Sequence, residues 1–562
     1  MKKLMKVVCI VLSVVIMTSV TGVLGACSGG KGGKDIDETK TQLNINHYNG
    51  GFGDQWLEKA IQDFQEEYED FSFEEGKTGI QIWPSSGKLS GSSLMDQAKY
   101  LQDHIFISQA ITYRDFVSTG VCLDITDVMT DELTSWGDEK KIVDGQTVDS
   151  TIELKLQPEQ KEFMNLGTEA NPQYYAIPHY FGTNGITYDV EIFNQYKLFF
   201  DQNGNMTKKN TDTGLSLGGD GIANTPDDGL PATYEQFFKL CNRLKNQLGI
   251  TPIIWSGQYQ FYSNYLLSAL AAEANGYDGH MLTQTLSGVS KNNIVSYSDD
   301  GVVTESKTIS SKDEQYLVYN QAGYYYALQF MKEIIDKEYY HENSFIGGFT
   351  HTDTQDEFIM SNREPSMDPI AMIVEGNWWE NEADTTFNTM DGTYPNSSRT
   401  ERKFGYMPLP KPNEEYIGNH TMLECNTSYM FINANISDNM KLAAKMFLKY
   451  INTDVKLREF SVISNTPKAL KYELKSEDLA KMSPFGRSVN ELKSHENTDV
   501  IYQCSTNPTY LANMGGTFDL QDVFSYGEYS FPSTAFYNDS NLTVSKFYAG
   551  YISAWQSKFA KL

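Results

Sequence analysis

Three glycines and two aromatic residues stand together in the segment HYNGGFGD, at residues 47–54. An alternating apolar stretch precedes the segment and an amphipathic stretch follows it, so we expect a turn between a strand and a helix. Nucleotide-binding loops require GxGxxG or GxxxxGK[ST]. Neither pattern is complete, because Trp56 takes the last glycine position of the first and Phe71 the early glycine position of the second. The turn's free N–H groups suit a polar neutral ligand such as a sugar, the alternative being a turn without a ligand.

Other patterns of catalytic residues are incomplete. The segment GLSLG at 214–218 matches GxSxG, but it lies in a Gly/Asn/Asp-rich stretch instead of between a buried strand and a helix. In HENSF, Phe345 stands where HExxH requires its second His. The segment VEGNWWENEAD offers carboxylates for a glycoside hydrolase, although such residues in an acidic protein also form solvated surface. These carboxylates are Glu375, Glu380, Glu382 and Asp384.

A long insertion at 201–233 is rich in Asp, Asn and Gly. Its oxygen-bearing side chains resemble the start of a calcium loop, and the returning strand of the loop could complete the coordination. It is not an EF-hand, because Met206 replaces the required Gly and Asp212 the required Glu. We predict a structural Ca²⁺ clamp, with a plain solvated loop as the alternative. The predicted ligands are Asp201, Asn203, Asn205, Asp220, Asp227 and Asp228.

Composition limits the partners. The 562 residues carry a formal charge of −28, which argues against nucleic acid or an anionic membrane surface. Aromatic residues make up 13% and include 35 Tyr, whose apolar face and polar tip suit wet binding surfaces. No CxxC or CxxH spacing is present, which argues against a zinc site. One or two long-range disulfides stay open among Cys122, Cys241, Cys425 and Cys504.

The N-terminus has the form of a secretory signal at 1–26, with three Lys residues, an apolar run and a small-residue ending. The ending LGAC resembles a bacterial lipobox, which implies cleavage before Cys27 and lipid on its thiol and amine. An uncleaved membrane anchor is the alternative. Residues 27–41 are Gly- and Lys-rich and are expected to form a flexible, lipidated tether. Either reading leaves the rest of the chain on the outer face of the cell membrane.

Patterns of strands and helices alternate along the chain, which predicts an α/β fold. We expect strands at 43–48, 78–84, 103–109 and 252–256, and a bent pair of strands at 174–193. Helices are expected after Asp54, a candidate N-cap, and at 112–120, 231–247, 323–337 and 441–452.

Several of these segments, in order, resemble the extracellular solute-binding lipoproteins of ABC importers, in the carbohydrate-binding group related to maltose-binding protein. The resemblance covers about 42–470. Its segments are HYNGGFGDQWLEKAIQDFQEEY, DHIFISQAITYRDFVSTGVCLDITDVM, YYAIPHYFGTNGITYDVEIFNQ, DDGLPATYEQFFKLCNRLK, AMIVEGNWWEN, FGYMPLPKP and TSYMFINANISDNMKLAAKMFLKYINTD.

This resemblance implies a periplasmic-binding-protein-like fold of two α/β lobes, with a hinge and an interlobe cleft. The first lobe would comprise 42–180, with 420–470 returning to it, and the second lobe 181–419, including the insertion. Residues 471–562 would form a helical, aromatic segment. The stretch FSYGEYSFPSTAFY at 524–537 could complete the cleft or cover the second lobe, and the sequence leaves both open.

The candidate ligand-binding residues follow the ends of expected strands, where ligands of open α/β sheets bind. An indole covers the apolar face of a sugar ring, and such stacking contributes about 1–3 kcal/mol by analogy with nucleic-acid bases. The resemblance implies that the Trp of the EG-x-W segment packs against sugar. The candidates are Tyr48, Asn49, Gly51, Phe52, Tyr113, His179, Tyr180, Trp255, Glu375, Trp378 and Trp379.

Anchor and resemblance together predict a lipid-anchored protein that captures a carbohydrate, with an oligosaccharide expected, and delivers it to the permease of an ABC importer. We expect neither catalysis nor a cofactor apart from the calcium ion. Two alternatives remain: a surface glycoside hydrolase, and a sugar-sensing lipoprotein that serves a membrane kinase.

Overall fold

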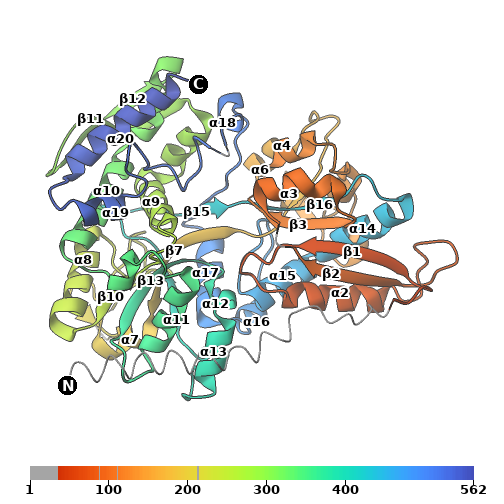
Figure 1. Cartoon of the computed structure of the whole chain (residues 1–562), viewed down its shortest axis with the longest axis horizontal. Helices are drawn as coiled ribbons and strands as arrows, with labels where there is room; N and C mark the ends of the chain where they lie inside the picture. The colour runs from red at the N-terminus through yellow and green to blue at the C-terminus, as the bar shows by residue number, and fades with distance from the viewer. Residues whose placement is uncertain (1–35, 88, 111, 210, 212–213, 515) are drawn as a thin grey trace.

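The computed structural model describes residues 36–562 apart from 88, 111, 210, 212–213 and 515. The predicted signal segment and Cys27 lie outside the described residues. Within the part that is described, no helix combines the length and the apolar character needed to cross a membrane. Figure 1 shows two lobes side by side, joined by strands that run between them. The α/β fold predicted from the sequence is confirmed.

The first lobe is built on a five-stranded sheet in the order β2-β1-β3-β16-β6. Strands β1 and its neighbours β2 and β3 are parallel, whereas β16 is antiparallel to β3 and β6. Helix α2 (Gln55–Glu67) buries its apolar stripe of Leu57, Ile61 and Phe64 on this lobe. The strand bounds are β1 (Thr41–His47), β2 (Ile80–Ser86), β3 (Ile105–Gln109), β6 (Ile177–Pro178) and β16 (Ser428–Ile432).

The second lobe is built on a six-stranded sheet in the order β10-β13-β7-β15-β17, with β14 also pairing with β7. Strand β7 is buried along its whole length and is antiparallel to β13, β14 and β15. The bounds are β7 (Gly182–Asp189), β10 (Thr251–Ile254), β13 (Ile370–Gly376), β14 (Phe404–Met407), β15 (His420–Asn426) and β17 (Thr498–Ile501).

Two strand connections pass between the lobes and form the hinge. Residues 179–181 lead from β6 to β7, and Thr427 leads from β15 to β16. A third passage, at 465–470, runs alongside the first: Phe181 N–H donates to Pro467 O at 2.9 Å, and Ala469 N–H donates to His179 O. Because three chain segments lie together here, the two lobes share one narrow connection.

A long helix and the C-terminal part of the chain complete the second lobe. Helix α9 (Phe261–Thr285) is kinked at Gly276 and packs on α10 (Ala322–Asp336). Helices α19 (Pro532–Asn538) and α20 (Val544–Phe559) cover α10. Phe524 and Phe536 lie in the hydrophobic cluster of this lobe. The aromatic stretch at 524–537 therefore covers the second lobe, one of the two roles left open above.

The insertion at 201–233 is fastened to the second sheet by a buried network of charges. On β15, His420 lies 2.9 Å from Asp227 Oδ2 and 2.6 Å from Glu273 Oε1 of α9. Lys411 Nζ reaches the same Glu273 oxygen at 2.7 Å. Against burial and the Lys411 charge, the carboxylates of Asp227 and Glu273 raise the pKa of His420 to about 9. Against burial, Lys411 and His420 lower the pKa of Glu273 to about 2.

The structure corrects the predicted capping role of Asp54 and answers the open question of disulfides. Asp54 occupies the N-cap position of α2, but its side chain makes no capping bond and instead pairs with His47 Nδ1 at 3.0 Å. The Asp54 carboxylate thus binds the His47 ring of β1 instead of the backbone N–H groups at the start of α2. Cysteines 122, 241, 425 and 504 are all free, so the described residues contain no disulfide between them.

Candidate functional site between the two lobes

The glycine-rich turn predicted at 48–53 lies where β1 ends, and it faces the second lobe. The Asn49 side chain accepts hydrogen bonds from the N–H groups of Gly51 and Gly53, at 3.0 and 3.2 Å. Gly51 has φ 86°, a left-handed conformation that residues with a Cβ atom rarely adopt. An added Cβ there would lie 2.7 Å from Glu382 Oε1 of the second lobe. The turn therefore closes against the opposite lobe, and Tyr48 and Asn49 beside it are half-buried.

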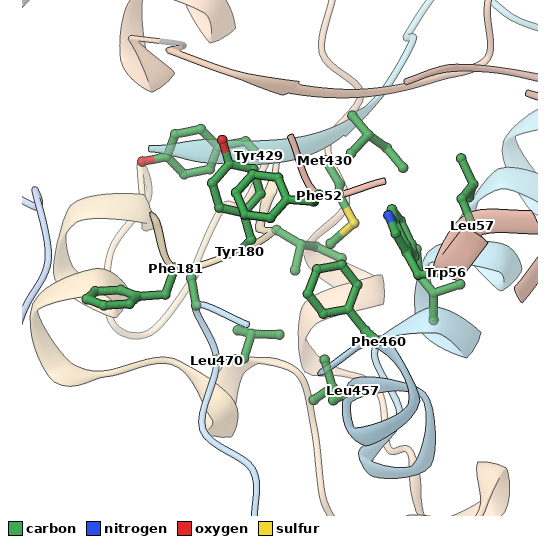
Figure 2. Packing of buried hydrophobic residues seen from close by; sticks show 14 of the residues in the cluster. Phe52, Trp56, Leu57, Tyr180, Phe181, Tyr429, Met430, Leu457, Phe460 and Leu470 are labelled. Carbon is green, nitrogen blue, oxygen red and sulfur yellow. The ribbon is translucent and has the colours of Figure 1, made fainter. Parts of the chain in front are cut away.

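Phe52 and Tyr180 form the aromatic centre of the interlobe contact. Figure 2 shows the two rings next to each other, and their centroids are 3.6 Å apart. Trp378 of the second lobe approaches Phe52 edge-on, with 6.1 Å between the ring centroids. The hydroxyl of Tyr180 donates to Gln109 Oε1 at the end of β3. Strands β1 and β3 are parallel neighbours, so their carboxyl ends bring the turn and Gln109 to one edge. Four predicted residues, Gly51, Phe52, Tyr180 and Trp378, are thus brought together.

His179, another predicted residue, lies beneath this centre in a buried pair. Lys468 Nζ lies 2.8 Å from His179 Nδ1, and the His179 ring packs on Trp56 at 4.9 Å. Burial lowers the pKa values of both His179 and Lys468 well below their usual range. The pair belongs to the hinge, because the backbones of Lys468 and Tyr180 form an antiparallel β-bridge there.

Glu375 and Glu382 meet on the second lobe beneath Trp378. Gln355, on helix α11 (His351–Ser361), donates to Glu382 at 2.8 Å and to Glu375 at 3.4 Å. Burial, followed by the neighbouring Glu382 charge, raises the pKa of Glu375 to about 8. The hydrogen bond to Glu382 raises the pKa of His351. Burial therefore favours the neutral acid form of Glu375 near pH 7, and its hydrogen bonds come from Gln355 and Gly376 of the second lobe.

Three predicted ligand-binding residues lie in the hydrophobic cores instead of at the lobe boundary. Tyr113 packs on Phe163 and donates to Met164 O, and all of its side chain is buried. Trp255 packs against Tyr340 and Phe345 in the second lobe. Trp379 lies among Phe358, Phe387, Phe404 and Phe485. Because no ring face is exposed, we assign these residues to packing.

A cavity of about 140 Å³ opens between the lobes next to this aromatic centre. Its first-lobe wall is the end of β3 at Ala110, which directly follows Gln109, and its floor is the hinge at 425–427. Its second-lobe wall consists of helix α9 and the chain after β17. The lining residues there are Tyr265, Gln503, Tyr510, Met514, Phe518, Asp519, Leu520 and Gln521.

The polar groups of the cavity are mostly uncharged. Gln521 Nε2 donates to the Tyr265 hydroxyl at 2.9 Å, and the Tyr510 hydroxyl donates to Gln503 Oε1 at 3.0 Å. The rings of Tyr510 and Phe518 stack 4.9 Å apart with 8° between their planes. None of the described lining residues is Lys, Arg or His. Burial raises the pKa of Asp519, which is the only acidic residue among them. The cavity is thus lined by aromatic side chains together with amide and hydroxyl groups.

Sequence reasoning did not find this wall. The segment 503–521 has no clear period and contains turns and only a short helix, α18 (Pro508–Leu511), so no pattern marks it. One signal was available in its composition, since the segment combines the aromatic residues Tyr510 and Phe518 with four amide side chains. Ala110, on the opposite wall, has φ 55°, a strained conformation that often accompanies binding sites.

The predicted calcium ligands fall into two groups. Asp201 Oδ1 accepts the N–H groups of Asn203 and Asn205 within a tight turn. The carboxylates of Asp220, Asp227 and Asp228 gather around the hydroxyl of Thr225. No group of three or more His, Cys, Asp or Glu residues suited to a metal ion is found in the described part of the chain. Calcium binding stays a prediction.

Comparisons with known proteins identify the fold. No family model matches the chain, and no curated protein sequence does. Among solved structures, a chitin oligosaccharide binding protein aligns with TM-score 0.52 and 14% identity, covering 92% of this chain and 99% of its own. Apo RafE from Streptococcus pneumoniae aligns with TM-score 0.52 and 13% identity over the same shares. RafE in complex with raffinose gives TM-score 0.51 and 14% identity. The chain therefore has the two-lobed fold of these binding proteins.

Proposed function

We propose that this chain is a solute-binding protein, which captures a carbohydrate between its lobes and hands it to the permease of an ABC importer. The fold supports the proposal, because the similar structures include a chitin oligosaccharide binding protein and RafE in complex with raffinose. An oligosaccharide is the expected solute.

The observation that carries the proposal is the composition of the interlobe cavity. Both lobes and the hinge line it, so a solute bound there contacts both lobes at once and favours their closed arrangement. Tyr265, Tyr510 and Phe518 contribute aromatic carbon atoms to the wall beside the apolar parts of a sugar, and Gln503 and Gln521 contribute amide groups beside its hydroxyls. Because the described lining residues include no Lys, Arg or His, they favour an uncharged solute over an acidic one.

The same geometry supports binding without cleavage. Glycoside hydrolysis needs two carboxyl groups on opposite sides of the bond that is broken. Glu375 and Glu382 share Gln355 on one lobe, and Glu380 is buried and accepts a hydrogen bond from Ser483. None of the three lines the cavity. Incubation with neutral oligosaccharides should therefore leave the chains at their original length.

The proposal includes a lipid anchor at Cys27, which would hold the protein at the outer face of the membrane near its permease. The lipobox-like sequence supports this, and it is tested by labelling expressing cells with a fatty acid analogue and comparing Cys27→Ser. The variant should be released from the membrane. A measurement of solute uptake distinguishes transport from the alternative of a sugar-sensing partner of a membrane kinase. If the protein serves an importer, uptake should fail in cells that lack it.

The binding experiment uses the chain from residue 36 onward. Thermal-shift screening against neutral mono- and oligosaccharides should give a rise in melting temperature, followed by calorimetric titration of the hit. Tyr510→Ala and Gln521→Ala should weaken binding by roughly tenfold or more, since each removes about one hydrogen bond or ring contact from the wall. Tyr100→Ala is the matched control, because Tyr100 is 71% exposed on the first lobe. Retained affinity in both wall variants would argue against this cavity.

A further inference from the structure

A second, much smaller cavity lies directly behind the interlobe cavity. Its volume is about 10 Å³. Gln503, Tyr510, Phe518 and Leu520 line both cavities, so the two cavities share part of their walls. The remaining lining comes mainly from helix α9 and from residues packed on it, deep in the second lobe.

Two polar side chains of α9 face this small cavity without a partner. His280 and Ser268 are 3% and 2% exposed. Neither ring nitrogen of His280, nor the hydroxyl oxygen of Ser268, has a hydrogen-bond partner among the described residues. Buried polar groups are rarely left unpaired, because they lose their bonds to water without replacement. Two such residues lining one cavity therefore indicate a missing polar group.

The chemistry of the missing group follows from the charge of its partners. Burial lowers the pKa of His280 to about 4, so its ring is neutral near pH 7 and has one donor and one acceptor nitrogen. The Ser268 hydroxyl also both donates and accepts. An ion would find no countercharge in these two groups, whereas a hydroxyl oxygen, which donates and accepts, satisfies both.

The size of the cavity agrees with a single oxygen. A water molecule needs a cavity of about 10–15 Å³ on this measure and two to four polar partners. His280 and Ser268 supply two partners, and the neighbouring pair of Tyr510 and Gln503 lies on the wall shared with the main cavity. The group would thus sit next to the residues that line both cavities.

We propose that the small cavity is a binding site for one hydroxyl oxygen, held between His280 and Ser268. The oxygen comes from a water molecule or from a hydroxyl group of the bound solute, and only the second source rests on the proposed function. In either case, the site supports the wall at Tyr510 and Gln503 from behind.

The direct test is a pair of high-resolution crystal structures of the protein, one without a sugar and one with the sugar identified in the screen. An ordered water between His280 and Ser268 in the sugar-free structure supports the proposal even if no sugar binds. If the same water persists with sugar bound, water is the source; if a sugar oxygen replaces it, the solute is the source. A cavity without density in the sugar-free structure and without a sugar oxygen in the loaded one overturns the proposal.

Stability measurements give a second test, because the direction of the change in melting temperature distinguishes an occupied cavity from a dry one. If Ser268 holds the oxygen, Ser268→Ala removes a bond and lowers the melting temperature. If the cavity is dry, the same change removes an unpaired hydroxyl and raises it. Ser263→Ala is the matched control on α9, because the Ser263 hydroxyl donates to Gln260 O at 2.7 Å and its loss should lower the melting temperature in both cases. A higher melting temperature for Ser268→Ala, with the control lowered, overturns the proposal.

Discussion

Gly51 and Trp378 meet across the boundary between the two lobes: a Cβ atom on Gly51 would lie 2.8 Å from Cδ1 of Trp378. The backbone of one lobe thus rests on an indole ring of the other. The glycine allows both the left-handed turn and this close approach, so the contact depends on the absence of a side chain.

Gly51→Ala should hold the lobes apart, because the added methyl group meets both Trp378 and Glu382. We expect a larger radius of gyration in small-angle X-ray scattering and a weaker solute affinity. Gly76→Ala is the matched control, since Gly76 has φ 80° with no atom within 4 Å of the added Cβ. Both variants carry a backbone strain of roughly 1–2 kcal/mol, but only the first should change the scattering. Equal profiles for the two would contradict the contact.

Stability should fall between about pH 6.5 and pH 9 because of His420. Its pKa rises from 6.5 to about 9 on folding, so the stabilisation is fully present below pH 6.5 and is lost as the pH passes 9. The loss is at most on the order of 3 kcal/mol for such a shift. Chemical denaturation at several pH values measures it. His420→Gln should flatten the curve in this range, and an unchanged slope in the variant would rule out His420 as its cause.

The free cysteines predict identical melting with and without reductant. Burial raises the pKa values of Cys122, Cys241, Cys425 and Cys504 far above the usual range, so their thiolates are scarce in the folded protein. Iodoacetamide followed by mass spectrometry should label these thiols only after unfolding. Detection of a disulfide-linked peptide among them would contradict the structure.

Calcium binding predicts a higher melting temperature in calcium than in a chelator. The carboxylates of Asp220, Asp227 and Asp228 repel one another around Thr225, and a divalent cation would relieve that repulsion. Asp228→Asn should reduce the difference, while Asp438→Asn, on the exposed start of a distant helix, should not. Identical melting curves with and without calcium would contradict the predicted calcium site in the insertion.

Local sequence patterns sufficed for much of the fold but for only part of the site. The period of Leu57, Ile61 and Phe64 predicted α2, and the alternation before Tyr48 predicted β1. Helix α9 escaped prediction, because its small and apolar residues are buried on nearly all sides and show no stripe. Hydrophobic periodicity detects helices that have one solvent-exposed face, and α9 has almost no exposed face.

The aromatic residues show a different limit. Trp378 and Trp379 are adjacent and identical in type, yet one meets the opposite lobe and the other fills a core of phenylalanines. Which face a side chain takes depends on partners far along the chain, such as Phe52 and Phe404. The Tyr510 wall depends likewise on long-range packing, here against Phe518 and helix α9.

The last wall of the interlobe cavity has a consequence for how the protein matures. Residues 503–521 leave the ribosome near the end of synthesis, after every strand of both sheets. A nascent or prematurely terminated chain that stops before them can assemble most of its architecture but has no complete pocket. Under the proposed function, only a chain that extends past residue 521 can form the complete pocket for the solute.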